Sequence, residues 1–496
     1  MTRTTHKTAW RGDDFPPWLS PMVVKELRQG VQSGAFAWTF VALQVAMFLA
    51  LSFGVLDFDA TGRGPGTFTL QYFFWPIVAA AVLVIIPLRG LGAISGEQAD
   101  GKLDLVRLTR LSATSIVLGK WLAIVAQGAL LVTAILPYVV LRYFFGNINV
   151  VGDLVTIGWL FAGSMVVAAA AIALSTRARG LRIAIAVLAL PLFVSFMELL
   201  DNPGGRSMMG PGSWVGLLAA VALYTAVLLE YSAAKIAPIA ENHALRQRSL
   251  ALAIGLVWLL VAAFAATPTA ILTILITLPL VIAFPIGAIL EQPVHLRSQA
   301  AAFARFGLPG RLAAWVLTPG WATGLVFAVV MMALGLSAWW WVADVRYGVP
   351  RGETVWVMAF GGLLGATVVF PLPAVVWLPR VRNRLLPYVL VQLVCLLAFA
   401  YASAMKPFST AWESWWEGWM WLLPLPLASL SCLLTSGRSG AMALACLMAS
   451  IAVTVVVFLV VLRPWLREMR TTGQLLAEAR AARARRAGAV DRGATA

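Results

Sequence analysis

Residues 36–56 read FAWTFVALQVAMFLALSFGVL, a stretch in which only Thr39, Gln44 and Ser52 interrupt the apolar side chains. A helix needs about 20 mainly apolar residues to cross the roughly 30 Å hydrocarbon core of a bilayer, where every backbone polar group must be bonded within the segment. A second stretch, 441–462, carries no charge at all. Both stretches therefore predict transmembrane helices.

The whole chain has the composition of a membrane protein. Apolar residues make up 61% of it and charged residues only 12%, about half the charged fraction of an ordinary soluble domain. The net charge of +16 would suggest nucleic-acid binding in a soluble protein, but here the basic residues lie between the apolar runs. We therefore attribute the charge to membrane topology and expect no nucleic acid among the partners.

The apolar runs, separated by turn and charge signals, predict an all-α polytopic membrane protein with about 12 transmembrane helices. These spans lie near 36–56, 72–88, 116–141, 154–175, 183–199, 213–232, 250–266, 269–290, 314–342, 354–378, 386–405 and 441–462. A further segment near 410–436 carries four tryptophans at helical spacing, Trp412, Trp415, Trp416 and Trp419, and then two prolines. We interpret it as an interfacial helix followed by a re-entrant piece; a ligand-stacking site is the alternative.

The distribution of Lys and Arg supports this topology. If the segment near 410–436 re-enters and both termini are cytoplasmic, 30 of the 37 Lys and Arg residues lie on the cytoplasmic side; if it crosses, only 23 do. Basic residues accumulate on the cytoplasmic side of membrane proteins, so twelve spans are favoured. The first 19 residues are polar and lack the apolar core of a cleavable signal peptide. We expect a multi-pass protein of a bacterial-type cytoplasmic (inner) membrane.

A division into two six-helix halves is a further hypothesis. The predicted parts are a cytoplasmic N-terminus at 1–35, a first six-helix unit at 36–232, a cytoplasmic linker at 233–249, a second six-helix unit at 250–462 and a basic cytoplasmic tail at 463–496. The sequence from Gly92 to Gln98, GAISGEQ, pairs with the sequence from Gly287 to Gln292, GAILEQ, if one gap is allowed. The match is short, but an internal duplication would explain why both stretches follow the second span of a half.

The loop after the second span reads SGEQADGKLDLVRLTRLS at 95–112. Charges and leucines alternate in it at helical spacing, so that Leu103, Val106 and Arg107 share one face of a short helix. On periodicity alone, such a helix lies between the membrane surface and a docked soluble domain, or the segment is a solvated connector.

This loop resembles the cytoplasmic loop of ABC-2 type transporter permeases, where a glutamate precedes Gly-Thr-Leu-Glu, several leucines, Thr-Pro-Leu-Ser and a Gly-Lys that opens the third span. The matching residues are Glu97, Gly101, Leu103, Leu105, Leu108, Thr109, Leu111, Ser112, Gly119 and Lys120. Lys102 stands in place of threonine, Asp104 in place of glutamate and Arg110 in place of proline. The resemblance extends over residues 18–235.

The resemblance implies a membrane-spanning permease subunit of an ABC export system. The chain lacks a Gly-x-x-x-x-Gly-Lys-Ser/Thr phosphate-binding loop, so ATP would be hydrolysed by a separate ABC ATPase (nucleotide-binding) subunit. The residues implied to dock that ATPase are Glu97, Gly101, Leu103, Asp104, Leu105 and Leu108, and 291–311 is a second candidate loop. The substrate is left open, because a path lined by apolar side chains suits lipids, peptides, drugs or polymers.

A helix is also predicted directly before the first span. Ser20 can cap free backbone N–H groups, and Pro21 needs no donor at the first helical position. In ABC-2 permeases a short amphipathic elbow helix lies on the inner membrane surface at this point. The resemblance implies that Lys25, Glu26 and Arg28 face water.

Two other classes of function are kept as alternatives. An ion-coupled secondary transporter usually needs a titratable residue or a broken helix near the bilayer midplane, whereas Glu198 and Glu230 lie near span ends, where we expect them to be wetted. A polytopic membrane-embedded enzyme needs a catalytic or metal constellation, but the three histidines lie in polar segments and the three cysteines in apolar runs. We therefore expect no catalytic residue, metal or cofactor in this chain.

The basic tail is expected to bind anionic lipid headgroups at the inner membrane surface; a solvated tail that only fixes topology is the alternative. Its arginines are Arg463, Arg467 and Arg470 directly after the last span and Arg480, Arg483, Arg485 and Arg486 in an Ala-rich helical stretch. A homodimer or a higher assembly is also compatible with the sequence.

Overall fold

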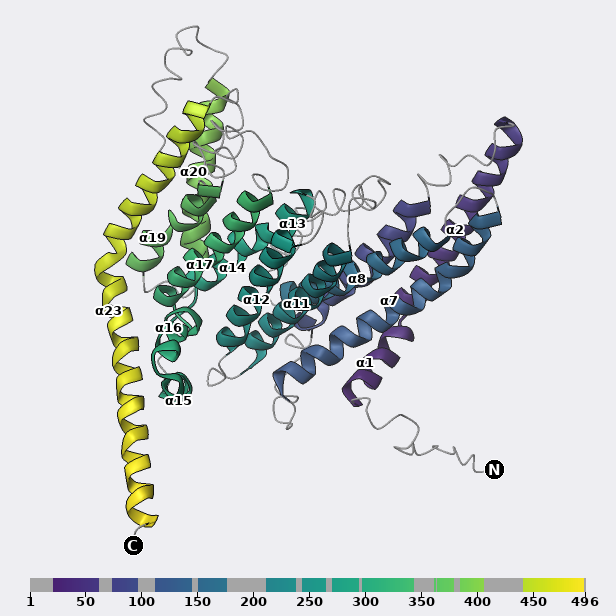
Figure 1. Cartoon of the computed structure of the whole chain (residues 1–496). Helices are drawn as coiled ribbons and strands as arrows, with labels where there is room; N and C mark the ends of the chain where they lie inside the picture. Colours follow the sequence, from purple (N-terminus) through teal and green to yellow (C-terminus); the bar gives the residue numbers. More distant parts are fainter. Residues whose placement is uncertain are drawn as a thin grey trace. The chain divides into compact units, whose positions relative to one another are not determined.

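The computed structural model describes residues 21–61, 74–96, 112–144, 150–175, 211–237, 243–264, 270–293, 297–342, 361–378 without 363, 384–405 and 440–494. Every regular element in these residues is helical, and none of them forms a strand (Figure 1). The prediction of an all-α protein is confirmed for this part of the chain.

Eight of the described helices are long and apolar enough to cross a membrane. They are Gly34–Phe53, Phe74–Gly92, Ala113–Tyr143, Val150–Ser175, Trp214–Ile236, His243–Phe264, Trp321–Trp340 and Leu447–Arg485. Three shorter apolar helices, Ile276–Ile289, Leu364–Trp377 and Leu385–Val394, coincide with three more of the predicted spans. The remaining predicted span, 183–199, and the segment near 410–436 lie outside the described residues. The chain is thus a multi-pass membrane protein, and the number twelve stays a prediction.

The chain divides into two compact units, which we describe separately. Unit 1 comprises Met1–Pro191 and Tyr224–Pro238, and unit 2 comprises Leu192–Leu223 and Ile239–Ala496. The helix α11 (Pro211–Ile236) therefore contributes residues to both. The predicted division into two six-helix halves stays a prediction.

Unit 1 is built around two long antiparallel helices, α7 and α8. Its described elements are α1 (Pro21–Val31), α2 (Gly34–Thr61), η2 (Ala80–Ile85), α4 (Ile86–Leu88), η3 (Arg89–Gly92), α7 (Ala113–Phe144) and α8 (Val150–Ser175). The helix α7 packs against α1, α2 and α8, and fully buried side chains such as Leu131, Ile135 and Leu160 fill the space between these helices. Ser33 caps the start of α2, since its Oγ accepts a hydrogen bond from the backbone N–H of Phe36.

Unit 2 is centred on α17 (Trp321–Trp340), which packs against α12 (His243–Phe264), α13 (Ala270–Val281) and α14 (Ala283–Ile289). The other elements are α15 (Arg297–Phe303), η4 (Ala304–Phe306), α16 (Gly307–Leu317), α19 (Leu372–Trp377), α20 (Leu385–Met405) and α23 (Gly440–Ala494). A buried apolar cluster joins α14, α17, α19 and α23 and includes Ile289, Leu325 and Val457.

Two of the predicted spans of unit 2 are interrupted. The run 269–290 breaks at Ile282 between α13 and α14, because Pro285 has no N–H to bond the carbonyl three to four residues earlier. The run 314–342 breaks between α16 and α17, where Gly320 adopts a φ of +145°, a value that other residues rarely adopt. The span proper therefore begins at Trp321.

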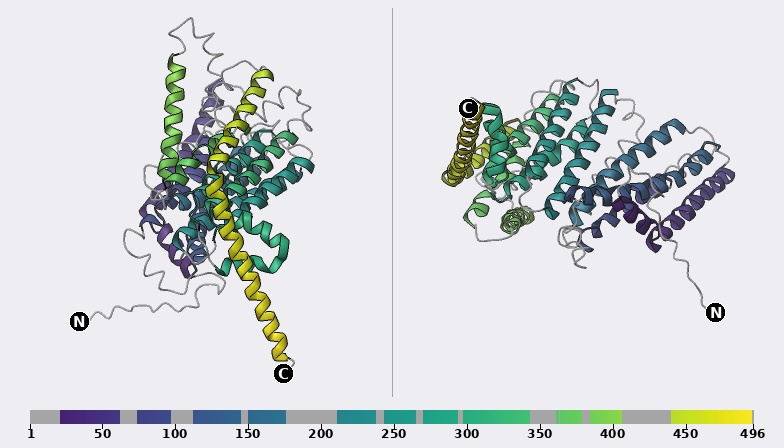
Figure 2. Two further views of the ribbon diagram at one scale, coloured as in Figure 1. Left: turned by 90° about the vertical axis from the view of Figure 1, so that its left-hand side faces the viewer. Right: turned by 90° about the horizontal axis from the view of Figure 1, so that it is seen from below.

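The last span and the basic tail form one helix. The helix α23 runs for 55 residues from Gly440 to Ala494, which at about 1.5 Å per residue makes it roughly 80 Å long. The left view of Figure 2 shows it running without a break to the C-terminal end. The tail is thus helical and continuous with the span, and its binding to anionic headgroups stays a prediction.

Candidate functional site: a helical hairpin and its arginine clasp

The predicted docking loop and the predicted elbow helix have different outcomes. The docking residues Glu97, Gly101, Leu103, Asp104, Leu105 and Leu108 all lie outside the described residues. The elbow helix is present as α1, which begins at Pro21 as the sequence predicts. Lys25 and Arg28 are exposed, and the expectation that they face water stays a prediction.

Glu26, the third residue expected to face water, is partly buried. Its Oε1 forms a salt bridge of 3.2 Å with Nζ of Lys120 on α7, and the Lys120 side chain is only 4% exposed. The preceding Gly119 lies against Met22 of α1, and a Cβ at Gly119 would come within 3.0 Å of Met22 Cγ. The elbow helix therefore packs against Gly119 and Lys120 near the start of the third span.

Arg89 fastens the corner between α1 and α2. It donates hydrogen bonds to the Ser33 hydroxyl and to the Gln127 side chain, and to the carbonyl of Gly30 at 3.3 Å. These partners belong to the start of α2, to α7 and to the end of α1. The polar groups at this end of unit 1 thus tie three elements together.

In unit 2, α15 and α16 form a helical hairpin, residues 297–317, that lies beside α23 (Figure 1). Phe303 and Ala314 of the hairpin pack around Leu476 of α23. The Arg480 guanidinium donates to the carbonyl of Gly307 at the turn. Gly307 has a φ of +58°, which allows the tight turn into α16. The tail helix therefore supports the hairpin along its length.

The tip of the hairpin is apolar and basic. Phe306 is 69% exposed, Leu308 74% and Leu312 61%, and the arginines beside them, Arg305 and Arg311, are also exposed. We call these five residues the tip surface. Arg311 stacks over the ring of Trp315 with its Cζ 5.1 Å from the ring centroid.

The position of the tip surface along α23 separates it from the membrane. Gly307 meets Arg480, which comes 18 residues after Leu462, so the turn lies roughly 27 Å along the helix from the end of the uncharged run. Headgroups occupy only about 5–8 Å on each side of the hydrocarbon core. Exposed apolar patches of this kind mark sites of contact with another protein or with a membrane.

Arg248 of α12 connects the hairpin to the spans. Its side chain is 2% exposed, and Nη2 donates to Glu291 Oε2 at 2.6 Å. The same guanidinium donates to the carbonyls of Val316 at 2.8 Å, Thr318 at 2.7 Å and Gly320 at 3.1 Å, and to Thr323 Oγ1 at 3.2 Å. These carbonyls end α16 and form the break before α17; Thr323 Oγ1 also donates to the carbonyls of Thr318 and Gly320, and the N–H of Gly324 donates to that of Gly320. We call Arg248 with these partners the arginine clasp.

Two further contacts join α20 and α23 to the clasp. Arg384, directly before α20, donates to the carbonyl of Glu291 at 3.3 Å. Burial lowers the pKa of the Arg384 guanidinium from its usual value, and the negative charge of Glu468 on α23 opposes that shift. Trp465 Nε1 of α23 donates to the carbonyl of Ala322 at 3.0 Å. Residues of α23 and the residue before α20 therefore lie close to the clasp and to the start of α17.

Other polar groups give no second site. Among the described residues no three His, Cys, Asp or Glu side chains lie close enough to hold a metal ion. Arg142 and Asp153 form a buried pair of 3.0 Å, and Arg142 lies over the Phe74 ring. Glu230 is only 9% exposed, so the expectation that it is wetted at a span end is wrong; Glu198 lies outside the described residues.

The sequence pointed only partly to this site. Glu291 stood out as the partner of Glu97 in the paired loops, but Arg248 was counted only as a topological charge. The Thr318-Pro319-Gly320 turn before Trp321 was the signal that could have revealed the break. No protein-family model, curated protein or solved structure matches the chain.

Proposed function

We propose that this chain is the membrane-spanning permease subunit of an ABC-2 type export system in a bacterial-type cytoplasmic membrane. The support comes from the loop at 95–112, from the elbow helix seated on Gly119 and Lys120, and from the hairpin of unit 2. In this proposal ATP is hydrolysed by a separate ATPase subunit, and the substrate class is open.

The observation that carries the proposal is the tip surface, which offers Phe306, Leu308 and Leu312 to water on a rigid support. Interface cores are enriched in aromatic side chains and arginine, which matches this composition. The proposed ATPase docks on the tip surface and on the loop at 95–112, one docking element after the second span of each half.

The arginine clasp supplies the path for motion in this proposal. A displacement of the hairpin pulls on the carbonyls at the end of α16, and Arg248 passes the displacement to α12 and Glu291. Because α17 begins at the same break, its start moves with the hairpin. The spans of unit 2 therefore respond to the partner without contacting it.

The test uses the ATPase encoded beside this gene, purified with the full chain and reconstituted in nanodiscs. The triple variant Phe306→Asp, Leu308→Asp, Leu312→Asp should abolish stimulation of ATP hydrolysis, since each hot-spot residue in an interface contributes about 2 kcal/mol or more. A matched control places three aspartates at Ala477, Ala481 and Ala482, which are exposed on α23. Glu97→Arg with Leu105→Asp tests the first loop in the same assay.

The proposal is wrong if the tip-surface variant and the Glu97→Arg, Leu105→Asp variant, both folded, stimulate the ATPase as the unmodified chain does. It is also wrong if the gene has no ATPase beside it. An ion-coupled secondary transporter is the second candidate, favoured by one observation: the acidic side chain of Glu230 is buried in the apolar helix α11. Intramembrane carboxyl groups often carry coupled protons.

A further inference from the structure

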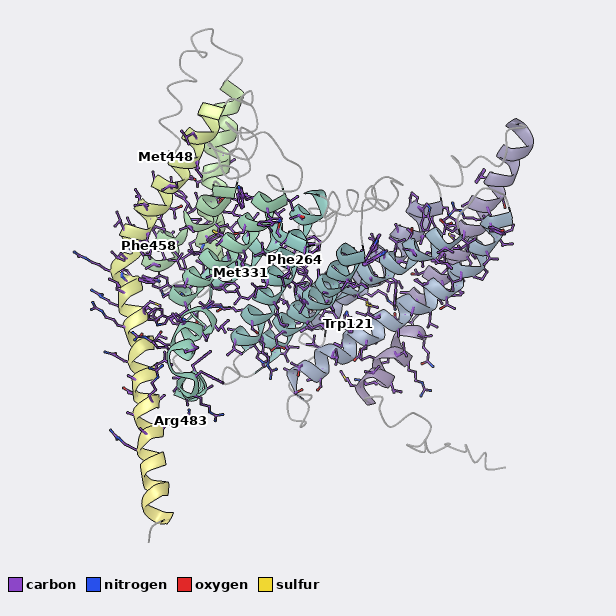
Figure 3. The ribbon with its side chains drawn as sticks, viewed as in Figure 1. Trp121, Phe264, Met331, Met448, Phe458 and Arg483 are labelled. Atoms are coloured by element: carbon purple, nitrogen blue, oxygen red, sulfur yellow. The ribbon has the colours of Figure 1, made fainter. Side chains whose placement is uncertain are left out.

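The side of α23 turned away from the hairpin carries a row of arginines. Arg463, Arg467 and Arg470 are exposed and lie at i, i+4 and i+7, so they share one face of the helix. The residues that pack on the rest of unit 2 include Trp465, Met469 and Leu476. At about 100° per residue, the arginine row lies opposite this packing face. Figure 3 shows nitrogen-tipped side chains projecting from α23 on the side away from α15 and α16.

The row begins where the uncharged run ends. Arg463 follows Leu462 directly, and Arg470 lies about 12 Å along the helix from Leu462. A headgroup layer about 5–8 Å thick and a Debye length of about 8 Å cover this whole interval. The three guanidinium groups are therefore at the depth of lipid phosphates.

The distal arginines lie much farther along the helix from the uncharged run. Arg480, Arg483 and Arg485 come 18 to 23 residues after Leu462, which places them roughly 27–35 Å along the same continuous helix. Even a tilt of about 40°, the upper end for membrane helices, leaves roughly 20 Å, more than two Debye lengths. Figure 3 shows how far Arg483 lies from Phe458, which is inside the span. The expectation that the distal arginines bind the membrane stays a prediction, and this geometry favours the proximal row.

We propose that Arg463, Arg467 and Arg470 form a binding surface for anionic phospholipid headgroups. Guanidinium groups donate paired hydrogen bonds to phosphate oxygens, and a negative lipid surface attracts each such charge. Glu468 does not neutralise the row, because it is turned toward Arg384 on another face of the helix. The lipid contact fixes α23 at one depth, and α23 supports the hairpin.

The test compares two triple variants of the full chain that remove the same charge. The proximal variant carries Arg463→Gln, Arg467→Gln and Arg470→Gln, and the distal variant carries Arg483→Gln, Arg485→Gln and Arg486→Gln. Each purified protein is titrated with spin-labelled phosphatidylglycerol and with spin-labelled phosphatidylcholine in vesicles. The unmodified chain should prefer phosphatidylglycerol over phosphatidylcholine. At the strongest site this preference should be about 100-fold weaker in the proximal variant, roughly fivefold per arginine, and unchanged in the distal variant.

Three further measurements decide the outcome. The variant Arg463→Lys, Arg467→Lys, Arg470→Lys keeps the charge and should keep most of the preference, which separates lost binding from lost folding. Rising salt should reduce the preference of the unmodified and distal proteins together, and inorganic phosphate at millimolar concentration should not displace the lipid. An unchanged preference in the proximal variant, an equal loss in the distal one, or no preference in the unmodified chain would overturn the proposal.

Discussion

Arg248 and Glu291 are 43 residues apart in the sequence, yet Nη2 of the arginine lies 2.6 Å from Oε2 of the glutamate. The pair joins the start of α12 to the segment directly after α14. Because the same guanidinium bonds the carbonyls at the break between α16 and α17, one side chain fixes the geometry of three helix ends. The break in the backbone and the buried charge therefore depend on each other.

Replacing Arg248 by methionine should destabilise the protein by about 3–5 kcal/mol, since it removes one partner of a largely buried ion pair and the hydrogen bonds that the guanidinium donates at the break. Arg248→Lys should recover only part of this loss, because one ammonium cannot reach four carbonyl and carboxylate partners in a fork. Thermal unfolding in detergent measures both. The double variant Arg248→Met, Glu291→Gln should lose less than the sum of the single losses, and additive losses would show that the pair is not coupled.

The close approach of α14 and α17 gives a second prediction. A Cβ at Gly324 would lie 2.1 Å from the carbonyl oxygen of Ala288, so Gly324→Ala should force the two helices apart and cost about 1–3 kcal/mol. Gly287 also lies on α14, and no atom would lie within 4 Å of a Cβ at this position. Gly287→Ala should be neutral or stabilise the helix by up to about 1 kcal/mol. Equal melting temperatures for the two variants would contradict this packing.

The sequence was sufficient for features that depend on local composition. The run 36–56 predicts a span because its apolar side chains follow one another directly, and the structure has a helix at Gly34–Phe53. Ser20 and Pro21 predict the start of α1 for a similarly local reason.

Features that depend on contacts between distant residues could not be predicted in this way. Hydropathy reads through the breaks at Ile282 and Gly320, because the residues on both sides are apolar. The fate of Glu26 depended on Lys120, which is 94 residues away. Leu476 supports the hairpin only because the tail helix lies beside α15, and no local sequence pattern predicts that contact.

The elbow helix gives a third prediction. Glu26→Gln removes the negative charge beside the buried ammonium of Lys120 and should cost about 1–3 kcal/mol. Lys25→Gln changes an exposed neighbour on the same helix and should have an effect within about 0.5 kcal/mol. Chemical denaturation of the two variants in the same detergent measures the difference. A smaller loss for Glu26→Gln than for Lys25→Gln would show that the ion pair does not hold α1 on α7.

Glu230 separates the two candidate functions. In a permease driven by a separate ATPase, Glu230→Gln should leave transport independent of the proton gradient and change its rate little. In an ion-coupled carrier, the same change should abolish uptake or efflux driven by an imposed pH gradient. Proteoliposomes with the gradient as the sole energy source test this. Asp153→Asn is the control, because Asp153 is also buried but its carboxylate is paired with Arg142.

The packing of the hairpin on the tail makes the final prediction, which concerns sidedness. Because Phe303 and Ala314 surround Leu476, the tip surface and the tail must lie on the same side of the membrane. In a variant without the three native cysteines, Arg305→Cys and Gln474→Cys should therefore react with an impermeant thiol reagent from the same side. The charge distribution further predicts that this side is cytoplasmic, so an alkaline phosphatase fusion after Ala496 should be inactive and one near Trp416 active. Labelling of the two cysteines from opposite sides would contradict the packing, whereas an active fusion after Ala496 would reverse the orientation and leave the packing intact.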